Sequence, residues 1–350
     1  MAKNQLGHVT VVGAGYMGKG IAHTLARAGA TVILTDASPD QAEQGHVAML
    51  AEVAKAERDG LLPLGSLDRV RAGTSWAPGI AQAVADAQFV MEVVTEDKDV
   101  KVSVLTQIEQ SAPEGAIIAT NTSAIPISVL AASLRRPERF FGVHWYNPAP
   151  YLPGIEIICG ESSDQSLLAG VIALLRAAGK DPVTVADTPG FVANRLQFAL
   201  FREAALMVEE GRATPRQIDA VVRSSFGFRL PFFGPFAIAD MAGLDVYASA
   251  FATLEEAYGD RFKAPEILTQ RVLAGDLGTK TGGGLVQMSP EELTRTVELR
   301  DRSYAALSDL RSRLSASDEP CAPSAACEVG DGCGVGATGE SVAGESDSLR

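Results

Sequence analysis

The sequence is poor in positive charge. Its 350 residues contain 30 lysines and arginines against 43 aspartates and glutamates, which gives a formal net charge of −13. A protein that binds a phosphate backbone or an anionic lipid surface needs a basic face, so neither a nucleic acid nor a membrane is expected as a partner. Long apolar runs are also missing. None reaches the roughly 18 residues that a membrane-spanning helix needs, and the first residues carry no signal-peptide pattern.

Cysteine is scarce as well, with four residues in the whole chain. So few cysteines cannot build a dense disulfide framework, and a cytoplasmic protein is expected. Cys321, Cys327 and Cys333 have five residues between neighbours, and no histidine accompanies them. Because zinc sites usually show more closely spaced cysteine pairs, no metal site is expected.

The end of the chain lacks aromatic residues. From Ser315 onward, seven acidic residues face one basic residue, Arg350, so this segment carries −6 of the net charge. It is rich in glycine, alanine and serine, and such a composition cannot bury enough apolar surface to offset the entropy of ordering it. The sequence therefore predicts a disordered acidic tail over residues 315–350.

What the chain does contain begins with a glycine-rich turn. A β-branched run at residues 8–12 precedes it, and a helical stretch at 19–28 and a second strand at 31–35 follow. The turn consists of Gly13, Ala14, Gly15, Tyr16, Met17 and Gly18. Glycines at these places allow a tight turn, a close approach of the backbone to a pyrophosphate, and tight packing of helix on strand. The helix N-terminus then faces the anion, so the pattern predicts a dinucleotide site, with an ordinary glycine-rich turn as the alternative.

An acidic residue follows at the distance that such a site requires. Asp36 ends the second strand, 21 residues after Gly15. A carboxylate there accepts hydrogen bonds from the adenosine ribose hydroxyls. It would repel a 2′-phosphate, and no arginine follows it immediately. The sequence therefore favours NAD over NADP.

Strand and helix patterns alternate over the first half of the chain only. Further strand patterns occur at 89–94, 117–120, 140–143, 155–158 and 183–185, and helical patterns follow at 191–210, 215–225, 244–258 and 266–274. Such an order predicts an α/β fold, a doubly wound, mostly parallel Rossmann-type sheet followed by an all-α C-terminal domain. We place the NAD-binding domain at 1–187 and the helical domain at 188–288. Ser289 and Glu292 form a capping-box pattern, which predicts a C-terminal helix at 289–314.

Three polar residues near strand ends are candidates for acid–base chemistry. His144 ends a strand, where ligand crevices form in α/β sheets, and a neutral imidazole suits the removal of a hydroxyl proton. Glu156 lies inside an apolar strand, where an unpaired charge would be costly, so it is a candidate to orient the imidazole. Ser123 ends another strand at the same sheet edge and could bond a substrate oxygen. A satisfied core histidine is an equal alternative for His144 on these grounds alone.

Several motifs carry a resemblance to a known family. They are Gly13–Gly18, Asn121-Thr122-Ser123, His144-Trp145-Tyr146-Asn147-Pro148, Glu156, Asp187 to Arg195, and Lys280-Thr281-Gly282. In this order and spacing the chain resembles the L-3-hydroxyacyl-CoA dehydrogenase family from about residue 6 to 288. The resemblance implies an NAD-binding domain, a helical domain that forms a homodimer, and an active site in the cleft between the domains.

The resemblance also implies roles for individual residues. His144 would be the base and Glu156 its orienting partner, with Ser123 and Asn194 completing the polar cluster. Asn194 could instead be a surface amide of a helix. Contacts near the nicotinamide map onto Glu96, Lys101, Asn147 and Lys280. For Glu96 and Lys101, a solvated ion pair is the alternative.

The implied activity is that of an NAD-dependent oxidoreductase in fatty acid metabolism. It would oxidise the hydroxyl of an L-3-hydroxyacyl-CoA, such as 3-hydroxybutyryl-CoA, to a ketone. Met49 and Ala56 stand where CoA-using members carry a serine and a lysine, which leaves open a free hydroxy compound resembling carnitine, gulonate or a hydroxymethylpyridine carboxylate. A β-hydroxyacid dehydrogenase of the phosphogluconate type and a non-enzymatic NAD-sensing protein are more distant alternatives.

Overall fold

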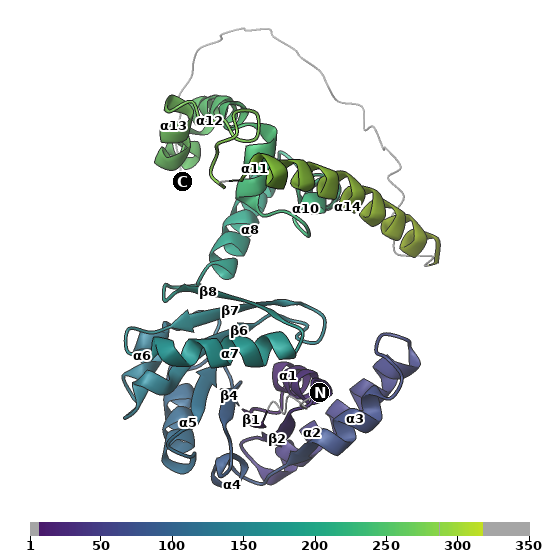
Figure 1. Ribbon diagram of the computed structural model, residues 1–350, viewed down its shortest axis with the longest axis vertical. Helices are drawn as coiled ribbons and strands as arrows, with labels where there is room; N and C mark the ends of the chain where they lie inside the picture. The colour runs from purple at the N-terminus through teal and green to yellow at the C-terminus, as the bar shows by residue number, and fades with distance from the viewer. Residues whose placement is uncertain (1–6, 287, 318–350) are drawn as a thin grey trace, which may run out of the picture. The chain divides into compact units, whose positions relative to one another are not determined.

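A computed structural model describes residues 7–286 and 288–317 of the chain (Figure 1). By its internal contacts the chain divides into two compact units, one ending at Glu210 and the other beginning at Gly211. The predicted domain boundary after residue 187 stays a prediction. From residue 318 onward, the predicted acidic tail lies outside the described residues.

One eight-stranded sheet, of strand order β3-β2-β1-β4-β5-β6-β7-β8, forms the centre of the first unit. The strands are β1 (His8–Val12), β2 (Thr31–Thr35), β3 (Thr74–Trp76), β4 (Phe89–Glu92), β5 (Ile117–Thr120), β6 (Phe140–Trp145), β7 (Gly154–Cys159) and β8 (Asp181–Ala186). All neighbours are parallel except β6 and β7, which are antiparallel. The strand order reverses at β1 and β4, and ligands bind beyond the carboxyl ends of strands at such a point. The predicted mostly parallel Rossmann-type sheet is confirmed.

Helices flank this sheet in the first unit (Figure 1). They are α1 (Tyr16–Arg27), α2 (Pro39–Arg58), α3 (Ser66–Gly73), α4 (Ile80–Val84), α5 (Lys98–Ser111), α6 (Ile127–Ala131), the short 3₁₀ helix η1 (Pro137–Arg139) and α7 (Gln165–Ala177). The last helix of the unit, α8 (Ala193–Glu209), follows β8 and has no buried residue. Local chemistry explains several of their starts. The Ser38 hydroxyl accepts from the Gln41 amide at the start of α2, and the Asp97 carboxylate accepts from two amides at the start of α5.

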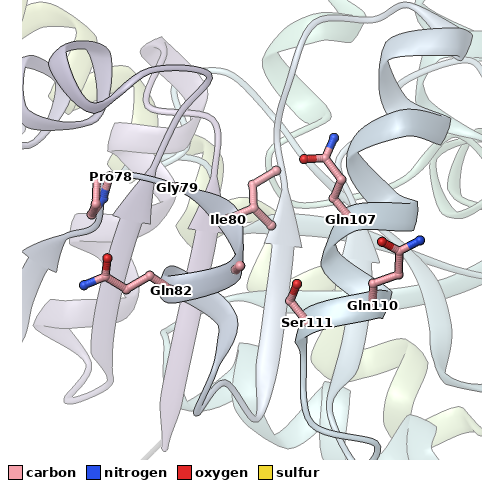
Figure 2. Close-up of a pocket in the computed structure, with 8 residues that line it drawn as sticks. Pro78, Gly79, Ile80, Gln82, Gln107, Gln110 and Ser111 are labelled. Carbon is pink, nitrogen blue, oxygen red and sulfur yellow. The ribbon is translucent and has the colours of Figure 1, made fainter.

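A hollow of about 470 Å³ lies between α4 and α5 (Figure 2). Its polar side chains are the amides of Gln82, Gln107 and Gln110 and the hydroxyl of Ser111. None of its lining side chains can act as an acid or base near neutral pH. We therefore do not assign proton-transfer chemistry to this hollow.

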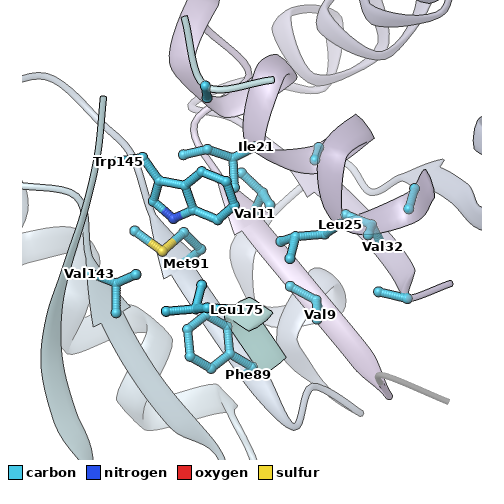
Figure 3. Packing of buried hydrophobic residues seen from close by; sticks show 14 of the residues in the cluster. Val9, Val11, Ile21, Leu25, Val32, Phe89, Met91, Val143, Trp145 and Leu175 are labelled. Atoms are coloured by element: carbon cyan, nitrogen blue, oxygen red, sulfur yellow. The ribbon is translucent and has the colours of Figure 1, made fainter. Parts of the chain in front are cut away.

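The sheet separates two apolar cores, as alternation along β1 shows. Val9 and Val11 pack into the core formed with α1, α2, α3 and α7, whereas Val12 packs into the core formed with α4, α5 and α6. Figure 3 shows the first of these cores, where Trp145 from β6 lies close to Ile21 from α1 and Met91 from β4. A sheet that is covered on both faces is typical of parallel α/β folds.

The second unit is entirely helical in its described residues. Its elements are α9 (Pro215–Ser224), α10 (Phe226–Arg229), α11 (Pro235–Ala242), α12 (Leu244–Tyr258), the 3₁₀ helix η2 (Gly259–Phe262), α13 (Glu266–Leu273) and α14 (Pro290–Ser317). Tyr304 from α14 packs on three phenylalanine rings, with centroid distances of 5.9, 6.3 and 6.1 Å to Phe228, Phe232 and Phe233. No single helix among the described residues has both the length and the apolar composition of a membrane span. One pair, α11 with 244–262, has both only when taken together, and it is bent by 101°.

A buried histidine in α1 leads to a prediction about acid stability. Among the described residues, no hydrogen-bond partner meets Nδ1 of His23, and burial, followed by the positive charge of Arg27, lowers the pKa of His23 to about 4. Below the ordinary histidine pKa of about 6.5, the unfolded chain binds a proton at His23 but the folded protein does not. The free energy of unfolding therefore falls as the pH decreases toward about 4. At about pH 5 this cost amounts to about 2 kcal/mol.

His23→Gln should remove this cost. The free energy of unfolding, measured by urea denaturation at about pH 7.5 and about pH 5, should fall less in the variant than in the wild type, by about 2 kcal/mol. His8→Gln, at an exposed position at the start of β1, should behave as the wild type does. An equal loss in His23→Gln and the wild type would show that His23 is not the group responsible.

Candidate active site

The glycine-rich turn between β1 and α1 has the shape of a phosphate cradle. A Cβ on Gly18 would lie 1.7 Å from the Gly13 carbonyl oxygen, and one on Gly13, whose φ is +115°, would lie 2.5 Å from the Val93 oxygen. Both positions therefore require glycine. A Cβ on Gly15 would meet nothing within 4 Å, so the space above it is open to a ligand. No acidic residue lies in the first turn of α1, which leaves the helix N-terminus available to an anion.

Asp36 lies beside this cradle, as its spacing predicts. One carboxylate oxygen accepts from the Ala14 amide at 2.5 Å, and the other accepts from the Ala37 amide at 2.7 Å. The carboxylate thus lies at the carboxyl end of β2 and bonds the neighbouring turn that would carry the pyrophosphate. The open space at Gly15 and this carboxylate together fit a dinucleotide whose ribose hydroxyls are free.

A pocket of about 760 Å³ opens at the same edge of the sheet. Six predicted site residues line it, namely Met17, Glu96, Ser123, His144, Asn147 and Asn194. All of these residues belong to the first unit. The fold therefore brings together, at one sheet edge, side chains from α1, from α8 and from the ends of β4, β5 and β6. Glu156 and Lys101 do not line the pocket but lie behind it.

His144 and Glu156 form a buried pair. They are direct partners in the antiparallel register of β6 and β7, and Nδ1 of His144 lies 3.0 Å from Oε2 of Glu156, with each residue 5% exposed. A carboxylate can only accept, so Nδ1 must donate, and in the neutral imidazole Nε2 is then the acceptor. The pair is consequently arranged to present a basic nitrogen.

The second oxygen of Glu156 holds the entry to α8. Oε1 accepts from the amides of Val192 and Ala193, each at 2.9 Å. Burial alone would raise the pKa of Glu156, but hydrogen bonds from His144, Tyr146 and these two amides outweigh it and hold the pKa below its ordinary value. Glu156 is therefore ionised at neutral pH, ready to stabilise a positive charge on the imidazole.

Ser123 and Asn194 meet beside this pair. The side-chain amide of Asn194 donates to the Ser123 carbonyl oxygen at 2.8 Å, which ties the first turn of α8 to the loop after β5. Asn194 is partly buried and is therefore not a free surface amide. The role of Asn194 toward a substrate stays a prediction.

Glu96 organises the loop that carries Ser123. Its Oε1 accepts from the Thr122 hydroxyl at 2.6 Å and from the Ser123 and Ala124 amides at 2.8 and 3.1 Å. Burial would raise the pKa of Glu96, but these donors and the charge of Lys101 lower it overall. Glu96 is thus ionised as well, and the loop wraps around its charge.

Lys101 is not part of a solvated pair. Its side chain is 1% exposed and its Nζ lies 2.8 Å from Oε1 of Glu92, which is fully buried. The sequence analysis missed Glu92. The pattern that singled out Glu156, a carboxylate in an otherwise apolar strand, also holds for Glu92 and could have found it.

Lys280 lies in the second unit. Its Nζ forms an ion pair with Asp245, at 2.6 and 2.9 Å from the two carboxylate oxygens. The nicotinamide contacts of Lys101 and Lys280 stay predictions.

Two family models match the chain. The model of the NAD binding domain of 3-hydroxyacyl-CoA dehydrogenase matches residues 8–188, and that of the C-terminal domain of 3-hydroxyacyl-CoA dehydrogenase matches residues 190–288. Together the two matches span more than half of the chain. Their order is that of the predicted NAD-binding and helical domains.

Individual relatives have similar lengths. The chain is 35% identical to 5-formyl-3-hydroxy-2-methylpyridine 4-carboxylate 5-dehydrogenase of Mesorhizobium japonicum over 304 residues, which cover 86% of this chain and 96% of that one. It is 34% identical to the probable 3-hydroxybutyryl-CoA dehydrogenase of Bacillus subtilis over 281 residues, which cover 80% of this chain and 96% of that one. Its structure is similar to that of a 3-hydroxyacyl-CoA dehydrogenase of Archaeoglobus fulgidus, with a TM-score of 0.71, 31% identity, and coverage of 86% of this chain and 99% of that one.

These matches exclude the phosphogluconate-type and non-enzymatic alternatives. The phosphate cradle and the Asp36 carboxylate agree with these matches. The cradle fits the pyrophosphate of NAD, and the carboxylate fits a ribose that carries no 2′-phosphate. The chain belongs to the 3-hydroxyacyl-CoA dehydrogenase family and is an NAD-dependent oxidoreductase that acts on a hydroxyl-bearing carbon.

Proposed function

We propose that the enzyme oxidises the secondary hydroxyl of an L-3-hydroxyacyl-CoA to the ketone, with His144 as general base. The observation that carries this proposal is the 3.0 Å pair of His144, which lines the pocket, and Glu156, which lies behind it. No lysine or arginine is among the residues that line this pocket in the first unit. A free carboxylate on the substrate would need a cationic partner in the pocket wall, whereas a thioester would not. The lining therefore suits a thioester substrate.

The mechanism assigns one step to each polar group. Nε2 of His144 takes the hydroxyl proton, and the charge of Glu156 stabilises the resulting imidazolium. The Ser123 hydroxyl, which donates to Glu96 at 3.3 Å in the ligand-free protein, turns its proton to the same substrate oxygen as that oxygen becomes the carbonyl. NAD, when bound, supplies the hydride acceptor. In the opposite direction His144 returns the proton to the oxygen.

A second candidate substrate is a free hydroxy compound. Met49 is a fully buried residue of α2, and Ala56 packs against the same core. Neither can offer the hydroxyl or ammonium that CoA-using members carry there. The Mesorhizobium relative is named for a free pyridine carboxylate. These observations favour a compound that resembles carnitine, gulonate or a hydroxymethylpyridine carboxylate.

One assay separates the two candidates. NADH oxidation with acetoacetyl-CoA is measured beside NAD reduction with a panel of free hydroxy acids, at equal enzyme concentration. The proposal predicts that acetoacetyl-CoA gives the highest kcat/KM of the panel. A higher kcat/KM with any free hydroxy acid would contradict the thioester assignment and identify that class of compound as the substrate.

Asp36 should determine the choice of cofactor. Its carboxylate repels a 2′-phosphate, so the wild type should have a higher kcat/KM with NAD(H) than with NADP(H). Asp36→Ala should narrow this preference by roughly tenfold or more, because it removes the repulsion together with the ribose contact. Steady-state assays with both cofactors check this. A wild type that prefers NADP(H) would contradict the assignment of Asp36.

We also propose that the enzyme is a cytoplasmic homodimer of fatty acid metabolism. Large apolar side chains of α8 are exposed, namely Leu196, Phe198, Leu200 and Phe201, and burial against a second copy is the usual way to cover such a surface. Light scattering at micromolar concentration should give twice the chain mass of 36.6 kDa. A stable species of 36.6 kDa would contradict the homodimer.

A further inference from the structure

A charged pair lies in the core directly behind the pocket. Glu92 ends β4 and Lys101 lies in the first turns of α5, with side chains 0% and 1% exposed and 2.8 Å between Nζ and Oε1. Burying two charges costs about as much as their attraction returns, so a buried ion pair is a poor device for stability alone. The pair therefore needs another explanation.

Glu92 joins β4 to the turn that follows it and to the end of β5, near the switch point of the sheet. Its Oε1 also accepts from the Val94 amide at 2.7 Å, and its Oε2 accepts from the Thr120 hydroxyl at 2.5 Å. Its backbone carbonyl accepts from the Asn121 amide at 2.8 Å. The Glu92 carboxylate thus holds the turn after β4 and the Thr120 side chain at the end of β5, while its backbone carbonyl extends the ladder between the two strands.

Lys101 carries this arrangement outward to the pocket. Besides Glu92, its Nζ contacts the Val94 carbonyl at 3.2 Å and Oε2 of Glu96 at 3.4 Å. The other oxygen of Glu96 then holds the Ser123 amide at 2.8 Å and the Ser123 hydroxyl at 3.3 Å. A continuous chain of polar contacts runs from the buried Glu92 to the backbone amide of Ser123, and it keeps that hold when the hydroxyl turns to the substrate.

We propose that Glu92 is a positioning residue of the dehydrogenase, which sets Glu96 and, through it, Ser123 by means of Lys101. The proposal rests on the role given to Ser123 in the proposed function. Glu92 lies outside the pocket lining, so it acts through the other residues and does not touch the substrate. Its loss would leave the Lys101 ammonium buried without a counter-charge, and Lys101 would draw Glu96 away from the Ser123 loop.

The test is a double-mutant cycle of Glu92→Gln and Ser123→Ala. Glu92→Gln keeps the size of the side chain and an acceptor for Thr120, but it removes the charge. In the wild-type background it should lower kcat by about tenfold, the scale of a small misplacement at a reacting centre. In the Ser123→Ala background it should lower kcat by less than about twofold, because the group that it positions is already gone.

A matched control separates positioning from general destabilisation. Glu109 also lies on α5, is buried, and accepts from the Arg135 and Arg136 amides at 2.9 and 2.7 Å. Glu109→Gln should lower the free energy of unfolding and leave kcat unchanged. If Glu92→Gln fails to fold, Thr120→Val decides instead, because it removes one contact of Glu92 and keeps the charge pair. It should show a smaller loss of kcat with the same dependence on Ser123.

The outcomes distinguish this proposal from the proposed function. If Ser123→Ala is impaired and Glu92→Gln costs the same factor in both backgrounds, the positioning role is overturned and the role of Ser123 stands. If Ser123→Ala turns over as fast as the wild type, the role of Ser123 in the proposed function fails and the positioning role fails with it. A wild-type kcat in Glu92→Gln also overturns the positioning role.

Discussion

His144→Gln should lower kcat by roughly 10²- to 10⁴-fold, the usual contribution of general acid–base catalysis. Glutamine can occupy the space of the imidazole and can still bond Glu156, but it cannot take up a proton at neutral pH. The glycine-rich turn and Asp36 are separate from His144, so the affinity for NADH should remain near that of the wild type. His144→Gln should therefore lower kcat without a matching change in the Kd for NADH.

Steady-state kinetics and NADH fluorescence titration check this expectation together. His46→Gln is the matched control, because His46 lies on α2 and bonds the Thr74 hydroxyl at 2.9 Å outside the pocket lining. That variant should keep wild-type kcat. A His144→Gln protein that binds NADH and retains near-normal kcat would contradict the role of His144 as base.

Glu156→Gln should be the second most damaging change, with a loss in kcat of about 10²- to 10⁴-fold. An amide at this position can donate to Nδ1, which stabilises the tautomer that carries the proton on Nε2. It also removes the charge that supports the imidazolium. Oxidation requires the neutral imidazole, because only its free Nε2 can accept the hydroxyl proton.

Glu156→Gln should also affect stability, because the same carboxylate holds the first amides of α8. The lowered pKa of Glu156 means that its ionised form stabilises the fold above the ordinary glutamate range, and that this contribution is lost as the pH falls through the lowered pKa. The stability difference between wild type and variant should therefore shrink in acid. Urea denaturation at two pH values measures it.

Asp187→Asn supplies a control for this second prediction. Asp187 accepts from the Ile127 and Ser128 amides, each at 2.8 Å, so it holds backbone as Glu156 does but makes no contact with His144. Its substitution should cost stability and leave kcat close to that of the wild type. A comparable loss of kcat in both variants would attribute the effect of Glu156→Gln to misplaced backbone.

Much of the fold could be predicted because its signals are local. The glycine pattern, Asp36 and the apolar strand runs each need only a short window of sequence. The strand β3 was missed, since Thr74–Trp76 is too short to show an alternating pattern. The predicted helix from residue 191 begins later, at Ala193. Phe191 has φ of +49°, outside the helical region, and is buried beside the His144 ring at 5.7 Å.

The site was predictable in its residue types but less so in its partners. His144 and Glu156 could be paired because a carboxylate in an apolar strand needs a partner and the family resemblance implies this one. The antiparallel register of β6 and β7 then brings the two face to face. The partners of Lys101 could not be deduced, since a lysine in an amphipathic helix is ordinarily exposed. Only the packing of α5 on β4 shows that it is buried against Glu92. Likewise, the sequence does not reveal that Asn194 bonds the Ser123 backbone.

The central claim is that His144 and Glu156 act as one catalytic unit, and a comparison of kcat among four proteins tests it most directly. These are the wild type, His144→Gln, Glu156→Gln and the double variant, each assayed with the best substrate of the panel and each shown to bind NADH. The account predicts that the double variant is about as slow as His144→Gln alone, because residues that act together are not additive. A double variant whose loss equals the product of the two single losses would contradict it.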